Sequence, residues 1–171
     1  MHIAALNKCD IANGEGIRVS LFVSGCDRAC PGCFNQKAWN YEYGTPYNDD
    51  VLATLLEYLG RPWVSGLTIL GGEPLAPRNQ EEVANIMKAV KAAYPSKTIW
   101  VYTGYTFEEL LSMETEAYTE YLPTIWEHLD VLVDGPYVEA LRDPSLRFKG
   151  SSNQRIIDLA ATYEKQEIVT L

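Results

Sequence analysis

Short strand-like runs alternate with helix-like stretches along this chain, and several of the runs end at a glycine. Runs rich in apolar and β-branched residues occur at 17–23, 67–70, 98–102, 130–133 and 154–159. Apolar residues at helical spacing occur at 49–59, 81–93, 107–113 and 118–128. This alternation is typical of an α/β fold made of βα units around a mainly parallel sheet. A closed eight-unit barrel usually needs about 250 residues, so the shorter chain predicts an open, partial (β/α) barrel of about five or six units.

The composition is that of an ordinary globular domain. Hydrophobic residues make up 47% and charged residues 22% of the 171 residues, which predicts one domain over 1–171 and excludes a disordered chain. The formal net charge of −9 disfavours a nucleic-acid partner, because such binding rests on Lys/Arg–phosphate contacts. No run approaches the roughly 20 apolar residues of a membrane span, and the first residues lack a secretory signal pattern. We therefore expect a cytoplasmic protein without a membrane partner, whose thiols stay reduced.

Three of the four cysteines, Cys26, Cys30 and Cys33, lie close together directly after the first strand-like run. Thiolates are soft ligands that suit iron–sulfur clusters, zinc or copper(I). A 4Fe–4S cluster normally takes four cysteine ligands, so three would leave one iron open to a small molecule. A catalytic cluster needs such an open iron, and an electron-transfer cluster does not. Cys9 precedes the first expected strand, whose far end carries Cys26, so we do not expect it to be a fourth ligand.

Polar turns follow the ends of three further strand-like runs. They are Gly71-Gly72-Glu73-Pro74, Thr103-Gly104 and Asp134-Gly135. In parallel sheets the chemistry lies at the carboxyl ends of the strands. The sequence therefore predicts that these turns and the cysteine loop meet on one rim.

The cysteine spacing, three residues and then two, resembles that of the radical S-adenosylmethionine (SAM) superfamily, and Gly71-Gly72-Glu73-Pro74 resembles its GGEP motif. The segments 14–18 and 22–35 resemble those of glycyl-radical-enzyme activases. The segments 130–136 and 146–155 resemble one branch of these, the activating proteins of anaerobic ribonucleoside-triphosphate reductases. The resemblance covers most of the chain. At Gly32 the sequence departs from many superfamily members, which carry an aromatic residue there.

The resemblance implies that Cys26, Cys30 and Cys33 ligate a 4Fe–4S cluster and that SAM chelates the open iron. It implies a radical SAM enzyme, in which the reduced cluster cleaves SAM to methionine and a 5′-deoxyadenosyl radical. That radical would remove a hydrogen from a glycine Cα of the partner, an anaerobic ribonucleoside-triphosphate reductase. A low-potential reductant such as flavodoxin would supply the electron.

The resemblance and the positions at strand ends together give a set of expected cofactor-binding residues. Glu73 is expected to bind the ammonium group of SAM, and Asp134 corresponds to an active-site acidic position in related activases. Arg155 is a candidate for the SAM carboxylate or for the partner. The expected set comprises Gly71, Gly72, Glu73, Pro74, Phe34, Asn35, Thr103 and Asp134.

Other interpretations of the cysteines stay open at this stage. The chain could activate a different glycyl radical enzyme, or be another small radical SAM enzyme such as a deazapurine synthase. A non-enzyme alternative is an iron–sulfur electron carrier with Cys9 closing the cluster. A structural zinc loop with Cys9 or His2 as fourth ligand is a third class, since structural zinc prefers four closed ligands. A large protein substrate would require an open side of the barrel.

Overall fold

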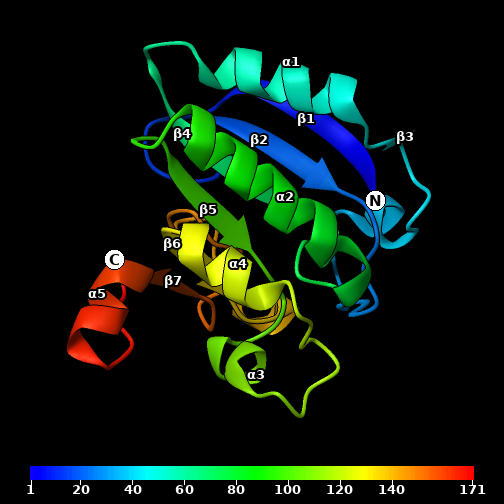
Figure 1. Ribbon diagram of the computed structural model, residues 1–171. Helices are drawn as coiled ribbons and strands as arrows, with labels where there is room; N and C mark the ends of the chain where they lie inside the picture. The colour runs from blue at the N-terminus through cyan, green and yellow to red at the C-terminus, as the bar shows by residue number, and fades with distance from the viewer.

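The structure, a computed structural model, describes residues 1–171 and contains one seven-stranded mixed sheet of order β3-β1-β2-β4-β5-β6-β7 (Figure 1). Strands β2, β4, β5 and β6 run parallel, while β1, β3 and β7 pair antiparallel with their neighbours. The sheet has two free edges, so it does not close into a barrel. The strands are β1 (His2–Asp10), β2 (Ile17–Val23), β3 (Thr45–Pro46), β4 (Val64–Gly71), β5 (Thr98–Tyr102), β6 (Val131–Asp134) and β7 (Arg155–Asp158).

Helices cover one face of this sheet (Figure 1). Each parallel crossover contributes at least one helix, and the alternate residues of the central strands, such as Leu67 and Ile69 of β4, are fully buried beneath them. The main core cluster contains 26 buried residues and includes positions from all of these layers. The helices are α1 (Asp49–Leu59), α2 (Pro77–Ala93), α3 (Phe107–Leu111), α4 (Leu122–His128) and α5 (Leu159–Lys165), with 3₁₀ turns η1 (Gln36–Trp39) and η2 (Glu139–Leu141).

The first residues of two helices show where apolar periodicity predicts a helix start correctly and where it predicts the start too late. Helix α1 begins where expected, because the Asn48 side chain accepts a hydrogen bond from Val51 N and caps the first turn. Helix α2 begins at Pro77, four residues before the expected start at 81. Proline suits a first helical turn, but the same turn carries the polar residues Asn79 and Gln80. Both are buried, so the first turn lacks the apolar residues that would mark its buried face in the sequence.

Both ends of the chain differ from the expectation. Residues 2–10 form strand β1, so Cys9 lies within the first strand and not before it. This strand escaped detection because Ile3 is its only buried residue, which leaves no clear alternation. At the other end, Leu159 begins α5 and does not extend the last strand. The Asp158 side chain accepts a hydrogen bond from Ala161 N at 2.9 Å and so starts the helix.

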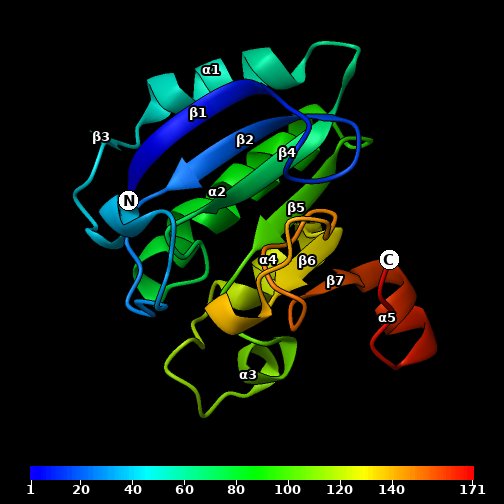
Figure 2. The same cartoon turned by 180° about the vertical axis from the view of Figure 1, so that it is seen from behind.

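The opposite face of the sheet carries no α-helix, and the segment 136–153, which includes η2, crosses it near β5 and β6 (Figure 2). Arg18 of β2 anchors this face and is only 1% exposed. Its guanidinium donates to Thr68 Oγ1 at 2.7 Å and lies 5.3 Å from the centroid of the Trp100 ring. Burial lowers the pKa of Arg18 to about 10. Its hydrogen bonds satisfy a cation that would otherwise be costly to bury.

None of the helices combines the length and the apolar composition that crossing a bilayer requires.

Candidate active site

The cysteine loop leaves the carboxyl end of β2 and is closed by the chain that returns after it. Gly25 N donates to Ala38 O at 2.7 Å, and Cys26 N donates to Trp39 O at 3.1 Å. Within the loop, Cys33 N donates to Cys30 O at 3.1 Å. These backbone bonds hold the three thiols on a single compact loop at the rim of the sheet.

The Gly71-Gly72-Glu73 turn lies directly beside this loop. Gly72 N donates to Val23 O and Glu73 N donates to Gly25 O, each at 2.7 Å. Gly71 has a φ of +116°, a conformation that side chains disfavour. A Cβ at Gly72 would lie 2.5 Å from Gly25 O, so only glycine allows the two loops to approach this closely.

Asn79 of α2 joins the same two loops from below. Its Nδ2 donates to Ser24 O and to Glu73 O, both at 3.0 Å. The residue is 1% exposed. Because one amide group satisfies two loop carbonyls, Asn79 fixes the distance between the cysteine loop and the glycine turn.

Glu73 connects the ends of β4 and β5. Its carboxylate accepts hydrogen bonds from Leu75 N at 2.9 Å, Thr103 Oγ1 at 2.7 Å and Gly104 N at 2.7 Å. The side chain is buried, and this burial raises the pKa of Glu73. The three donors oppose that rise, because they stabilise the ionised form. Glu73 and Thr103, expected together at the rim, are therefore in direct contact.

A cavity of about 150 Å³ lies among these groups. Most of the expected site residues line it: Cys26, Cys30, Cys33, Phe34, Gly71, Gly72, Glu73 and Thr103. The expected residues Pro74, Asn35 and Asp134 do not line it. The prediction that distant turns meet at one rim is borne out by this arrangement, because the cavity joins the ends of β2, β4 and β5.

The three thiols line the cavity, yet no group of three or more His, Cys, Asp or Glu side chains is gathered in the geometry that holds a metal ion. Burial raises the pKa of the Cys26 thiol. A bound metal would counter this effect, because a coordinating thiol is deprotonated. The donor chemistry, three soft sulfur ligands on one loop, fits an iron–sulfur cluster with one open iron.

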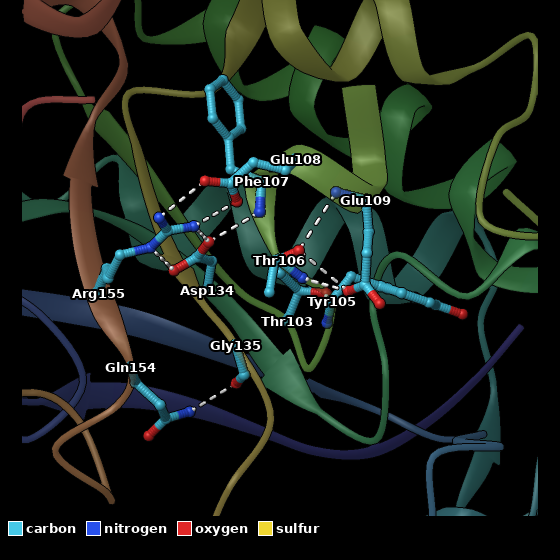
Figure 3. A network of polar contacts seen from close by, with 10 residues as sticks. All are labelled: Thr103, Tyr105, Thr106, Phe107, Glu108, Glu109, Asp134, Gly135, Gln154 and Arg155. Carbon is cyan, nitrogen blue, oxygen red and sulfur yellow. Dashed lines mark hydrogen bonds and ion pairs between the residues drawn. The ribbon is translucent and has the colours of Figure 1, made fainter. Parts of the chain in front are cut away.

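Asp134 lies at the end of β6 and is tied to β7 and α3 (Figure 3). Its Oδ1 accepts from Arg155 Nε at 2.9 Å, and its Oδ2 accepts from Phe107 N at 2.7 Å and from Arg155 Nη2. Arg155 also donates to both carboxylate oxygens of Glu108, at 2.9 and 2.6 Å. Both oxygens of Asp134 and the whole face of the Arg155 guanidinium are thus already engaged within the protein.

Several cavity residues were missed by the sequence reasoning. Arg28 lies between Cys26 and Cys30 in the sequence. Gly104 and Gly135 also line the cavity, whereas the sequence pointed to the residues directly before them, Thr103 and Asp134. A charged residue inside a ligand loop was the available signal for Arg28. The other lining residues are outside the expected cofactor-binding set, and the fold brings them to the cavity: Trp39, Leu70, Tyr102, Tyr137 and Gln154.

Gly32, the position of departure from the superfamily pattern, has a structural explanation. Gly32 has a φ of +75°, a conformation that side chains disfavour, and a Cβ there would also lie 1.2 Å from Glu139 Oε2 of η2. The following residue, Phe34, is 91% exposed at the edge of the cavity. The cysteine loop thus meets the segment 136–153 on one side and solvent on the other.

A larger cavity, of about 550 Å³, lies on the uncovered face and away from the cysteines. Trp100, Phe148 and the cations Arg147 and Lys149 are among its lining residues. Phe148 packs edge-on against Trp100 at 5.7 Å, and its carbonyl accepts a hydrogen bond from Tyr102 at 2.8 Å. Gln154 lines both cavities, so the two cavities adjoin at this residue.

Cys9 is exposed and lies far from the other three thiols. Its neighbour Asp10 pairs with Arg18 near the start of β2, whereas Cys26 follows the end of that strand. At about 3.3 Å per residue, this separation is roughly 20 Å or more. The geometry therefore excludes Cys9 as a ligand of the same metal centre.

The fold and the thiol loop together define an iron–sulfur protein of the α/β class. Residues 12–157 match the family model described as a 4Fe-4S single cluster domain. This match supports a 4Fe–4S cluster as the bound group.

The particular family follows from full-length relatives. The anaerobic ribonucleoside-triphosphate reductase-activating protein of enterobacteria phage T4 is 38% identical, over 91% of this chain and 93% of its own length. The proteins of that name from Pasteurella multocida and Escherichia coli K12 are 43% and 37% identical, over 86% and 85% of this chain and 90% of their own lengths. The chain belongs to the family of anaerobic ribonucleoside-triphosphate reductase-activating proteins.

Proposed function

We propose that this chain, as one domain over 1–171, is a radical SAM enzyme that generates a glycyl radical on an anaerobic ribonucleoside-triphosphate reductase. The observation that carries the proposal is the joining of the three-thiol loop to the Gly71-Gly72-Glu73 turn around one cavity. Three thiol ligands leave an iron free for a small molecule, and the glycine turn offers backbone beside it. The relatives, named as activating proteins of such reductases, supply the substrate class.

Cys26, Cys30 and Cys33 would hold the cluster. When bound and reduced, the cluster supplies the electron that cleaves SAM to methionine and a 5′-deoxyadenosyl radical. Gly71 and Gly72 allow the backbone to approach the methionyl group. Glu73 keeps a buried carboxylate at the base of the cavity, where a negative charge favours the ammonium and sulfonium of SAM.

The remaining expected residues act less directly in this proposal. Thr103 holds Glu73 in place and lines the cavity. Asp134 orders the ends of β6, β7 and α3 from outside the cavity. Phe34 and Asn35 form the outer edge of the cysteine loop, and Pro74 ends the glycine turn. These assignments follow from the hydrogen-bond partners of each residue and from its position relative to the cavity.

The protein substrate would approach from the uncovered face. An open partial barrel leaves this side of the sheet free of α-helices (Figure 2). Residues of the segment 136–153 and of β7 line the larger cavity there. A glycine is suited to enter such a site, because it has no Cβ and its backbone is permissive. A low-potential reductant such as flavodoxin, in the cytoplasm, would complete the system.

Anaerobic reconstitution with iron and sulfide tests the proposal. The wild-type protein should turn brown, cleave SAM to 5′-deoxyadenosine under reduction, and give the cognate reductase a glycine-centred paramagnetic signal. Cys30→Ala should abolish SAM cleavage, because the remaining two thiols cannot hold the cluster with a single open iron. Cys9→Ala is the matched control and should keep wild-type iron content and cleavage.

A colourless protein, or normal cleavage by Cys30→Ala, would contradict the cluster assignment. A cluster whose paramagnetic signal ignores added SAM would instead favour an electron carrier. If the protein cleaves SAM but gives no radical on the reductase, it is still a radical SAM enzyme, and the reductase is not its substrate.

A further inference from the structure

Arg28 occupies a particular place in the cysteine loop. It lines the same cavity as Cys26 and Glu73, and its guanidinium carbon lies 4.7 Å from the centroid of the Tyr105 ring. A Cβ on Gly104 would lie 2.6 Å from Arg28 Cδ, so the absence of a side chain there leaves room for the stem of the arginine. The ring of Tyr105 and the backbone of Gly104 thus hold the cation at the cavity.

The hydrogen-bonding capacity of this cation is not used. Arg28 Nε is buried and has no hydrogen-bond partner, and the side chain takes part in none of the salt bridges. A buried donor left unpaired is costly, so a native structure normally supplies an acceptor. The acceptor that best matches a guanidinium is a carboxylate or another planar or tetrahedral oxyanion.

Two other partly or fully buried arginines, Arg155 and Arg18, do not offer this capacity. Arg155 is fully engaged by Asp134 and Glu108 (Figure 3). Arg18 is engaged by Thr68 and by backbone carbonyls on the uncovered face. Arg28 is therefore the free guanidinium of the cavity, and the Glu73 carboxylate lies near it, since a Cβ on Gly104 would be 2.9 Å from Arg28 Nε and 3.3 Å from Glu73 Oε2. An amino-acid zwitterion carries the complementary pair of charges.

We propose that Arg28 binds the carboxylate of the methionyl group of SAM, the role that the sequence had suggested for Arg155. This inference rests on the proposed function, because it takes SAM as the ligand of the cavity. The guanidinium would donate from Nε and one Nη to the carboxylate oxygens and so fix the methionyl group against the glycine turn. Arg28 then selects ligands that carry a carboxylate.

Equilibrium dialysis under anaerobic conditions tests this role in the cluster-loaded, unreduced protein, which does not cleave SAM. The ligands are SAM and decarboxylated SAM, which lacks only the carboxylate. Arg28→Ala should weaken SAM binding by about 10–100-fold, as expected for lost charge-assisted hydrogen bonds. It should leave the binding of decarboxylated SAM unchanged or slightly stronger, because Glu73 then keeps its negative charge unopposed.

Two further variants sharpen the measurement. Arg61→Ala is the matched control, since Arg61 also stacks on a tyrosine, Tyr58, at 5.2 Å but lies outside the cavity; both affinities should stay at wild-type values. Arg28→Lys retains a charge without the planar fork, so its SAM affinity should fall between those of the wild type and Arg28→Ala. Iron content and the visible spectrum verify cluster loading, and Arg28→Lys carries the test if Arg28→Ala loads poorly.

The outcomes separate this inference from the proposed function. If the wild type binds SAM and Arg28→Ala or Arg28→Lys binds it equally well, the inference is wrong and the function stands. Equal weakening of both ligands also overturns the inference, because it indicates a role in loop shape. If the wild type binds neither ligand, the SAM site itself fails, and the assignment of Arg28 falls with it.

Discussion

Glu73 and Asp134 are two buried carboxylates at the carboxyl ends of parallel strands, and the protein satisfies them in different ways. Glu73 receives three neutral donors, from two backbone amides and the Thr103 hydroxyl. Asp134 receives one backbone amide and the charged guanidinium of Arg155. Neutral hydrogen-bond donors hold the Glu73 carboxylate, whereas an ion pair with Arg155 holds the Asp134 carboxylate.

The difference separates a ligand-facing charge from a structural one. The negative charge of Asp134 is neutralised inside the protein, so little field from it reaches the cavity. Glu73 forms no ion pair within the protein; burial raises its pKa, and its three hydrogen-bond donors oppose that rise by favouring the ionised form. Its position on the cavity then makes it available to a cationic ligand. Two acidic residues that look equivalent in the sequence thus have different uses.

The largest effect on this comparison should come from Asp134→Ala. The change leaves Phe107 N without its partner and removes the more buried carboxylate that binds Arg155. We expect a loss of about 3 kcal/mol in the free energy of unfolding, at the low end for a broken buried pair because Arg155 keeps Glu108. Urea unfolding of the cluster-free protein measures it. The SAM affinity of the loaded protein should change less than about twofold if the charge is structural.

An Asp134→Ala protein of normal stability that fails to bind SAM would reverse this assignment. It would restore the direct role that the sequence suggested for the residue.

A smaller effect is expected from Thr103→Val, which removes one donor from Glu73 and the acceptor of the Tyr105 amide at 3.1 Å. The change should cost about 1–2 kcal/mol of unfolding free energy and weaken SAM binding several-fold, because Glu73 loses part of its orientation. Thr54→Val, on the exposed side of α1, removes a comparable hydroxyl and serves as the control. If both variants bind SAM alike, the dipoles around Glu73 do not matter for the ligand.

The smallest effect on the free energy of unfolding is expected at Glu108, the solvent-exposed partner of Arg155. Hydrogen bonds from Arg155 lower the pKa of Glu108. A lowered folded-state pKa contributes stability above the unfolded pKa, about 4.3, and that contribution is lost as the pH falls through the folded value. Since Glu108 is exposed, Glu108→Gln should cost only about 0.5 kcal/mol at pH 7. Urea unfolding at several pH values should show the difference vanish in strong acid; a difference that persists there would contradict it.

The central part of this molecule was accessible from the sequence because its signals are local. Buried strands such as β4 and β5 are short apolar runs that end at a glycine or two residues before one. The rule that active groups lie at the ends of parallel strands predicted that Glu73 and Thr103 lie together. The three-cysteine loop carried its chemistry in its spacing. The parallel sheet, its helix-covered face and the cysteine–glycine contact therefore followed.

The rest depended on contacts between residues distant in the chain. Strand β1 lacks alternation because it is largely exposed, and the start of α2 is hidden by two buried polar residues. The partners of Asp134 lie 21 and 27 residues away in sequence, so nothing local distinguished its ion pair from a ligand contact. Arg28 likewise acquires its importance only when Tyr105 and Gly104 come beside it.

The contact between Gly32 and Glu139 has a consequence for the evolution of this loop. Gly32 also has a φ of +75°, a conformation that side chains disfavour, so a larger residue there is strained wherever the Glu139 side chain lies. An aromatic ring beside the third thiol would therefore need a different loop backbone as well as a shift of Glu139. Shortening Glu139 alone would not open this position to a larger residue.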